Sequence, residues 1–221
     1  MTFEMKPIAI LRSPWEEKFG VPRQPGLIPE AWGEVEFMDE FGVKEAREGL
    51  EGFSHVWITF LFDQVKDEET RLRVRPPRLG GNEKVGVFAS RSPFRPNRIG
   101  LSVCEIESVF PTLRLKGVDI VSGTPILDIR PYVPYVDSIP DAKVGFAPGP
   151  PARSQVSIKT AIAEEWEVLS ASDKALIEGM ISLRPRPAYQ AGSERTYHAR
   201  VAGREVAWVV LAQGAKIVRL S

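Results

Sequence analysis

Proline and glycine interrupt this chain so often that it has little room for long helices before residue 140. The 221 residues include 19 prolines and 18 glycines, and proline disrupts both helix interiors and central strands. The segments between them are short, and many alternate apolar with polar residues, as strands with one buried face do. The runs that we interpret as strands are 5–13, 33–38, 53–63, 100–110, 113–121 and 122–132. The pattern predicts a mainly β domain of about seven strands.

Two segments of this domain depart from simple alternation. Residues 53–63 are apolar on both alternating faces, so we expect this strand to be buried on both sides. Residues 44–52 are predicted to form a short helix that ends at Gly52.

A second, smaller unit follows a change in composition. Residues 140–154 hold four prolines and two glycines, which is typical of a linker. Beyond it, 172–183 is predicted to be a helix capped by Ser172, and 195–214 to form two strands that turn at Gly203. We therefore expect a small α+β unit at the C-terminal end.

The sequence carries no sign of a membrane span or of disulfide bonding. No run of about eighteen apolar residues occurs, and the first fifteen residues lack the apolar core of a signal peptide. Cys104 is the one cysteine, so no disulfide can form within the chain. We expect a cytoplasmic protein.

The charges are balanced in number but not in position. The chain has 29 Lys and Arg against 29 Asp and Glu, yet residues 71–98 hold eight basic side chains and one acid, an excess of +7 that the rest of the chain offsets. Such a stretch is either a solvated surface or a binding site for an anionic partner such as a nucleic acid.

Proline stiffens the most basic loop of this stretch, which contains Pro93 and Pro96. Proline fixes its own φ and holds the preceding residue extended. In a polyproline-II conformation Ser92, Arg95 and Arg98 would lie along one edge and suit a carboxylate or a phosphate. The alternative is a rigid loop that closes one end of a barrel, with its arginines in water.

Several common chemistries are excluded. Two histidines, His55 and His198, and one cysteine cannot form a zinc site of three or four soft ligands. No GxGxxG motif follows a strand, no GK[ST] ending completes a P-loop, and no serine lies in a GxSxG setting. Metal-free group transfer or binding without catalysis remains.

Six blocks of the sequence together resemble one family. They are VPRQPGL (21–27), GLEGFSHVWI (49–58), VRPPRLGGN (74–82), GVFASRSPFRPNRIGLS (86–102), SGTPILDIRPYVPY (122–135) and RPRPAY (184–189). In this order and spacing, the chain resembles the TrmO family, also called YaeB or TsaA-like, over nearly its whole length. Three positions depart from the family pattern: Arg98 in place of a proline, and Ser122 and Leu183 each in place of an acid.

The resemblance implies an S-adenosylmethionine-dependent tRNA methyltransferase. Members of this family methylate N6 of threonylcarbamoyl-adenosine next to the anticodon, at position 37, of threonine tRNAs. The implied fold is a single-sheeted β-barrel in residues 1–140 that binds the cofactor, with a small domain in 154–221 that assists tRNA binding. A homodimer with cofactor sites near the subunit interface is also implied.

Matched block by block, the resemblance also implies functional residues. The cofactor site would comprise Arg23, Gln24, Pro25, Asp63, Gln64, Arg91, Arg95, Leu101, Gly123, Thr124, Pro125 and Ile126. The basic residues expected to contact tRNA phosphates are Arg71, Arg73, Arg75, Arg98, Arg184 and Arg186, with Tyr189 as a stacking ring. No metal is expected.

The methyl transfer itself needs positioning more than acid–base chemistry. N6 of the acylated adenosine is a poor nucleophile that carries a proton, so a nearby base would help. Asp128 and Tyr132 are the predicted catalytic residues. For Asp128 the alternative is a structural ion pair with Arg130.

Two other functions stay open. One is an RNA-binding module on the same barrel without catalysis, which the three departures from the family pattern would suit. The other is a methyltransferase of the same fold with another substrate. Stabilisation by S-adenosylmethionine separates the first from an enzyme, and a steep salt dependence of tRNA binding argues against a small-molecule substrate.

Overall fold

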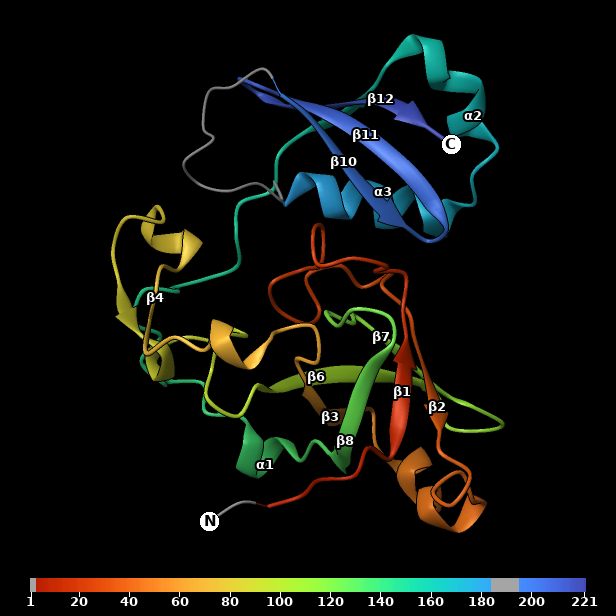
Figure 1. Ribbon diagram of the computed structural model, residues 1–221. Coiled ribbons are helices and arrows are strands. Elements are labelled where there is room, and N and C mark those ends of the chain that lie inside the picture. The colour runs from red at the N-terminus through yellow and green to blue at the C-terminus, as the bar shows by residue number, and fades with distance from the viewer. Residues whose placement is uncertain (1–2, 184–194) are drawn as a thin grey trace.

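The computed structural model describes residues 3–183 and 195–221. It has two units, a barrel in the first part of the chain and a smaller sheet with helices in the last part (Figure 1). The barrel strands are β1 (Ala9–Arg12), β2 (Gly33–Phe37), β3 (His55–Leu61), β6 (Ile99–Ser108), β7 (Leu113–Lys116) and β8 (Thr124–Pro131). The predicted mainly β class is confirmed.

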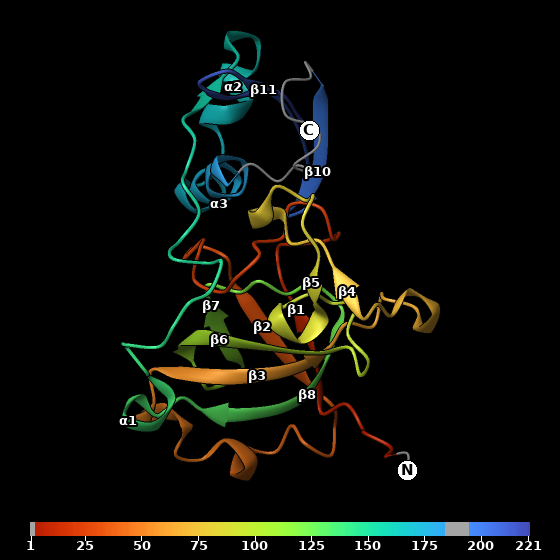
Figure 2. The same cartoon turned by 90° about the vertical axis from the view of Figure 1, so that its left-hand side faces the viewer.

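The six strands close into one antiparallel ring in the order β1-β2-β7-β6-β3-β8. β1 pairs with β2 on one side and with β8 on the other, and β6, β3 and β8 lie side by side in Figure 2. We expected about seven strands in the barrel, and it has six. Two further strands, β4 (Arg73–Val74) and β5 (Val85–Gly86), form a separate two-stranded sheet outside it.

Alternating apolar side chains fill the barrel. Leu11, Val35, Ile58 and Leu115 are fully buried in this core. Our expectation that β3 is buried on both sides was wrong, because its alternate residues 57, 59 and 61 are only half-buried on the outer face.

Gly100 makes room for an aromatic ring in the barrel. A Cβ at Gly100 would lie 2.2 Å from Cζ of Phe60 on the neighbouring strand. The missing side chain therefore lets the ring of Phe60 pack between the strands.

Short helical turns occupy the loops of this first unit. The predicted helix 44–52 is instead two 3-10 turns, η1 (Lys44–Arg47) and η2 (Leu50–Gly52), since Gly49 between them has a φ of 84° that ends a helix. The other turns are η3 (Asp67–Glu69), η4 (Pro77–Leu79), η5 (Val87–Ala89) and α1 (Pro134–Asp137).

The second unit is a four-stranded sheet in the order β10-β11-β12-β9. Its elements are β9 (Val156–Ile158), η6 (Thr160–Ile162), α2 (Ala163–Glu167), α3 (Ala171–Ser182), β10 (Thr196–Val201), β11 (Arg204–Leu211) and β12 (Gly214–Leu220). The predicted helix and hairpin are confirmed, and β12 is an additional strand. The cap of α3 is Ser170, whose hydroxyl accepts from the Asp173 N–H, and not Ser172.

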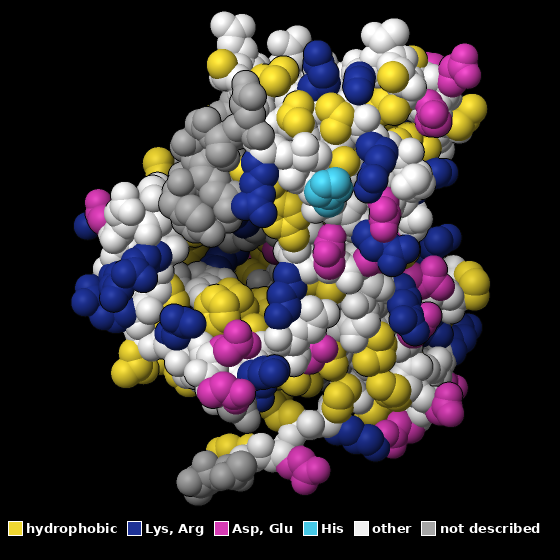
Figure 3. Space-filling model, turned by 45° about the horizontal axis from the view of Figure 1, so that its top comes forward, with side chains coloured by type: hydrophobic (Ala, Val, Ile, Leu, Met, Phe, Trp, Pro, Cys, Tyr) yellow, Lys and Arg dark blue, Asp and Glu magenta, His cyan; other side chains and the backbone are white. Residues whose placement is uncertain are grey.

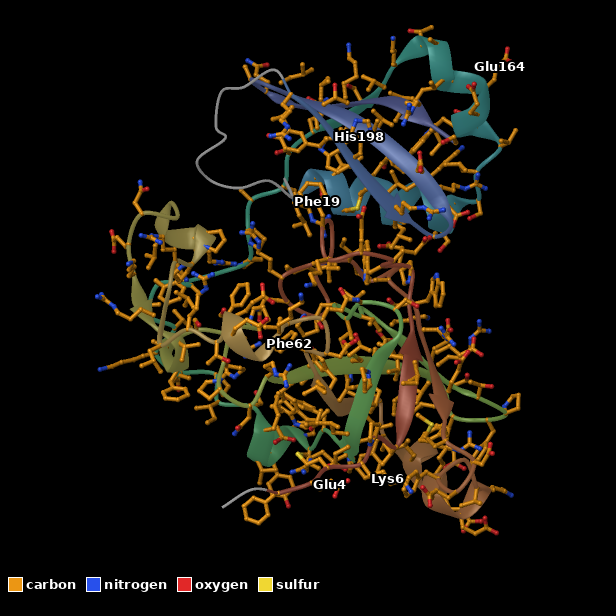
Figure 4. The ribbon with its side chains drawn as sticks, in the orientation of Figure 1. Glu4, Lys6, Phe19, Phe62, Glu164 and His198 are labelled. Atoms are coloured by element: carbon orange, nitrogen blue, oxygen red, sulfur yellow. The ribbon has the colours of Figure 1, made fainter. Side chains whose placement is uncertain are left out.

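A loop of residues 13–32, here called the wedge loop, joins the two units. Trp15 and Ile28 of this loop belong to the buried core of the second unit, and Phe19 points at that unit and stacks on Tyr197 and Trp208 (Figure 4). The Trp15 indole N–H also donates to the Val118 carbonyl at 2.8 Å. The wedge loop of the first unit is therefore part of the core of the second, which is distinct from the core inside the barrel.

The predicted linker, 140–154, runs between the two units without helix or strand. Arg78 donates to the Gly149 carbonyl at 2.5 Å, and Arg153 donates to the Leu27 carbonyl and to the Ser182 hydroxyl. These bonds fasten the linker to the sheet of β4 and β5, to the wedge loop and to α3. Among the described residues, no helix is long and apolar enough to cross a membrane.

Candidate functional site

A cavity of about 910 Å³ opens at one end of the barrel. Its walls come from the wedge loop, the ends of β3 and β6, the segment around β4, the linker and the last turn of α3. Figure 3 shows a hollow on this side of the molecule with Lys and Arg side chains gathered around it. The size and the mixed lining suit a cofactor-sized ligand.

The cavity combines apolar surface with a few polar groups. Phe60, Phe62 (labelled in Figure 4) and Ile120 supply apolar surface. Ser102 and Asp119 lie among them, and the Ser102 hydroxyl donates to Oδ1 of Asp119 at 2.6 Å. Burial raises the pKa of Asp119 to about 6, although the Ser102 hydrogen bond, its own backbone N–H and the Arg91 charge each act in the opposite direction.

Basic side chains outnumber acidic ones in the lining. They are Lys18, Arg23, Arg71, Arg73, Arg75, Arg78, Arg91 and Arg95. The acids among the lining residues are Asp63 and Asp119. Burial, and after it the charge of Arg78, lowers the pKa of Arg23, as expected where like charges are held together. An anionic ligand would relieve this repulsion.

The arginines of the proline-stiffened loop separate into two groups. Arg91 donates to Oε1 of Gln24 at 2.5 Å, and Arg95 donates to the Ser90 carbonyl at 3.2 Å; both line the cavity. Arg98 instead donates to the Val65 carbonyl at 2.5 Å and has a φ of 52°. The predicted polyproline-II row through Ser92, Arg95 and Arg98 was therefore wrong, because the backbone turns at Arg98.

Most of the predicted cofactor residues meet at this cavity. Those that line it are Arg23, Gln24, Asp63, Gln64, Arg91, Arg95, Leu101 and Thr124. Four others are not among the lining residues: Pro25, Gly123, Pro125 and Ile126. Strand alternation explains Ile126, which points into the barrel core and is fully buried. Gly123 lies in the turn just before Thr124, with a φ of 88°.

Neither of the two predicted catalytic residues is among the lining residues of the cavity. Asp128 forms an ion pair with Arg130 at 2.7 Å, the structural alternative raised by the sequence. The ring of Tyr132 lies 5.9 Å from that of Trp57, and Trp57 lines the cavity. Tyr132 is therefore one ring away from the site.

The predicted tRNA-binding residues fall into three places. Arg71, Arg73 and Arg75 line the cavity from the segment around β4, and the guanidinium of Arg71 stacks over Phe94 at 5.6 Å. Arg98, as described, bonds to the Val65 carbonyl. The remaining three, at 184, 186 and 189, lie outside the described residues.

Sequence reasoning missed Ser102 and Asp119. Asp119 stands in the run GVDIV, where an acid interrupts apolar residues between two strands; that interruption was the available signal. Within the described part of the chain, no group of three or more His, Cys, Asp or Glu could hold a metal ion.

A closed antiparallel barrel with a cationic cavity at its end defines a binding domain for an anionic or zwitterionic ligand, and comparison with known proteins gives the family. Residues 10–138 match the model of the tRNA-methyltransferase O N-terminal domain, and residues 151–221 that of the TrmO C-terminal domain. The chain belongs to the TrmO family.

Similar proteins match over almost the full length. The tRNA (adenine(37)-N6)-methyltransferase of Escherichia coli (strain K12) is 40% identical, with 99% of this chain and 98% of that protein covered. A putative S-adenosylmethionine-dependent methyltransferase RcsF of Pseudomonas aeruginosa is 45% identical, with 94% and 93% covered. The crystal structure of TrmO from Pseudomonas aeruginosa superposes with a TM-score of 0.82 at 36% identity, covering 100% of this chain and 99% of that chain.

Proposed function

We propose that this chain is an S-adenosylmethionine-dependent tRNA methyltransferase that methylates N6 of threonylcarbamoyl-adenosine at position 37 of threonine tRNAs. The observation that carries the proposal is the cavity of a chain that matches both TrmO domains, where most of the cofactor residues implied by the family lie together. The full-length similarity to a tRNA (adenine(37)-N6)-methyltransferase supports the position on the tRNA.

The lining residues fit the proposed cofactor. S-adenosylmethionine supplies an electrophilic methyl group on a sulfonium, together with a carboxylate, an ammonium and a nucleoside. Arg23, Arg91 and Arg95 offer guanidinium partners for the carboxylate. Phe60 and Phe62 offer apolar contact for the nucleoside. We assign Pro25 and Gly123 to the shape of the loops that carry these groups, and Pro125 and Ile126 to the start of β8.

The chain's part in the reaction is to align N6 of the adenine with the methyl group and to remove the N6 proton. Asp128 and Tyr132 are the proposed catalytic residues. Tyr132 lies next to Trp57 of the cavity lining, whereas Asp128 would have to exchange its partner Arg130.

The basic segment is the proposed tRNA-binding surface. Arg71, Arg73 and Arg75 face the cavity mouth, where phosphates flanking a splayed-out base would pass. Arg98 and the residues at 184, 186 and 189 are proposed to extend this contact. Residues 1–140 would then bind cofactor and target base, and 154–221 would assist in holding the tRNA.

We further propose a cytoplasmic homodimer. The described structure leaves large apolar side chains exposed at Leu101 near the cavity and at Tyr135, Val136 and Ile139 after β8. A second copy of the chain would cover them. Light scattering during size exclusion tests this, and a mass of one chain at micromolar concentration would contradict it.

Mass spectrometry of digested tRNA tests the proposed reaction. Purified protein is incubated with S-adenosylmethionine and threonine tRNA that carries or lacks the threonylcarbamoyl group. A gain of one methyl group, about 14 Da by its composition, on the modified nucleoside alone is expected. A methyl group on another nucleoside would retain the enzyme class and change the substrate. No methylation with tRNA still bound would favour the RNA-binding module.

A further inference from the structure

Asp119 is a carboxyl group at the cavity that the family resemblance does not assign to any role. It lies on the loop between β7 and β8 and reaches the cavity beside Ser102 and Ile120. The other acid of the lining, Asp63, is exposed to solvent, whereas Asp119 is half-buried. A half-buried carboxyl group in a cavity with eight basic side chains would be expected to pair with one of them.

No guanidinium neutralises it. Arg91, whose charge acts on Asp119, donates to Gln24, and among the described residues no ion pair includes Asp119. Its side-chain partner is the Ser102 hydroxyl at 2.6 Å. Cys104 lies on the same strand as Ser102, and burial, followed by the charge of Asp119, raises the pKa of its thiol, so the thiol is neutral.

The ionised carboxylate is thus poorly compensated. Burial is the largest cause of its raised pKa of about 6, and the Ser102 hydroxyl, its own N–H and Arg91 offset that cause only in part. At pH 7 to 8 the group is nevertheless ionised, so a positive ligand group placed beside it would gain an electrostatic partner without displacing an existing ion pair.

The proposed cofactor carries such groups. S-adenosylmethionine has two positive charges, on the sulfonium and on the ammonium, and its carboxylate is the one group that the cavity's arginines would attract. Resting on the proposed function, we propose that Asp119 is the residue that binds the positively charged methionine end of S-adenosylmethionine, by a direct ion pair inside the cavity. Ser102 then acts as a positioning residue that orients the carboxylate.

Calorimetric titration of three ligands tests this. S-adenosylmethionine has both positive groups, S-adenosylhomocysteine has the ammonium alone, and methylthioadenosine has neither. At pH 7.5, Asp119→Asn should weaken S-adenosylmethionine by about 10- to 100-fold and leave methylthioadenosine within about twofold. If the variant also binds S-adenosylhomocysteine more weakly, the ion pair is with the ammonium. If its affinity for S-adenosylhomocysteine is unchanged, the ion pair is with the sulfonium. Either result supports the proposal.

The pH dependence supplies a second measurement. Below pH 6 a proton competes with the ligand, so wild-type affinity for S-adenosylmethionine should fall by about tenfold per pH unit, while Asp119→Asn should show a flat profile. Ser102→Ala removes a hydrogen bond to the charged form, so its profile should break at a higher pH. Asp39 is exposed and far from Asp119 in the sequence, so Asp39→Asn is the matched control for the loss of one negative charge.

Four outcomes would overturn the proposal. Equal weakening of all three ligands would mean that Asp119 contacts the nucleoside. Unchanged affinity with lost methyl transfer would make it a proton acceptor. Binding of none of the ligands by folded wild-type protein would remove the proposed function together with this inference, whereas wild-type binding with an unaffected variant would remove the inference alone.

Discussion

Asp119→Asn should make the ligand-free protein more stable at neutral pH, although it removes a group placed at the functional site. The folded protein holds the Asp119 proton more tightly than the unfolded chain does, because burial raises its pKa from 3.8 to about 6. Stability from this group is therefore fully present below pH 3.8 and is lost as the pH rises through 6.

The magnitude follows from the difference between the two pKa values. About two pKa units, at 1.36 kcal/mol each, correspond to about 3 kcal/mol, and this is the upper bound because Asn cannot reproduce every contact of a protonated Asp. At pH 8 the variant should exceed the wild type in free energy of unfolding by about 1 to 3 kcal/mol. Near pH 4 the two free energies should converge.

Urea unfolding followed by tryptophan fluorescence measures this difference between pH 4 and 8. The comparison uses ΔΔG between the two proteins at each pH, so titration of other groups cancels. A difference that does not vary with pH would show a packing effect. A variant less stable at pH 8 would show that the carboxylate has partners beyond Ser102 and its own N–H, and the reasoning would fail.

Three further substitutions test the barrel, the loop and the RNA-binding surface. Gly100→Ala should destabilise the protein by about 1–3 kcal/mol because its Cβ would overlap the ring of Phe60; Gly86→Ala, with nothing within 4 Å, is the control in the same urea titration. Arg98→Pro, which restores the family's proline, should cost about 3 kcal/mol, since no proline ring adopts a φ of 52°; an unchanged melting temperature would show that the loop rearranges. Arg73→Gln should reduce the slope of log K for tRNA against log salt by about 0.7 to 0.9, and an unchanged slope would place this side chain away from phosphates.

Local sequence patterns predicted the elements of the barrel well. Prolines and glycines mark the ends of strands such as β2, and the apolar face of each strand marks the core. Both signals can be read because they depend on neighbours within a few residues. The cap of α3 was missed by two positions, since Ser170 and Ser172 satisfy the same local pattern. β12 was missed although its hairpin partner β11 ends at Leu211, directly before it; its other partner, β9, is distant in sequence.

Features that depend on tertiary contacts were beyond the sequence. Of the outer residues of β3, Trp57 lines the cavity, and the largely apolar composition of the run alone could not separate this from burial within a sheet. The left-handed turn at Arg98 depends on contacts such as its bond to the Val65 carbonyl, 33 residues away. The role of Asp119 emerges only when β6 brings Ser102 beside it.

The wedge loop fixes the distance between the C-terminal unit and the cavity. Trp15, Ile28 and Phe19 of this loop, which leaves the barrel after β1 and returns at β2, pack into the core of the C-terminal unit, so the spacing between that unit and the cavity is set when the chain folds and not when a ligand arrives. A tRNA held at both places must present its target base at that one distance. The enzyme would then select the nucleotide by its distance from the second contact on the tRNA as well as by its chemical identity. A tRNA with a shortened or lengthened anticodon stem should therefore be a poor substrate even with the correct base in place.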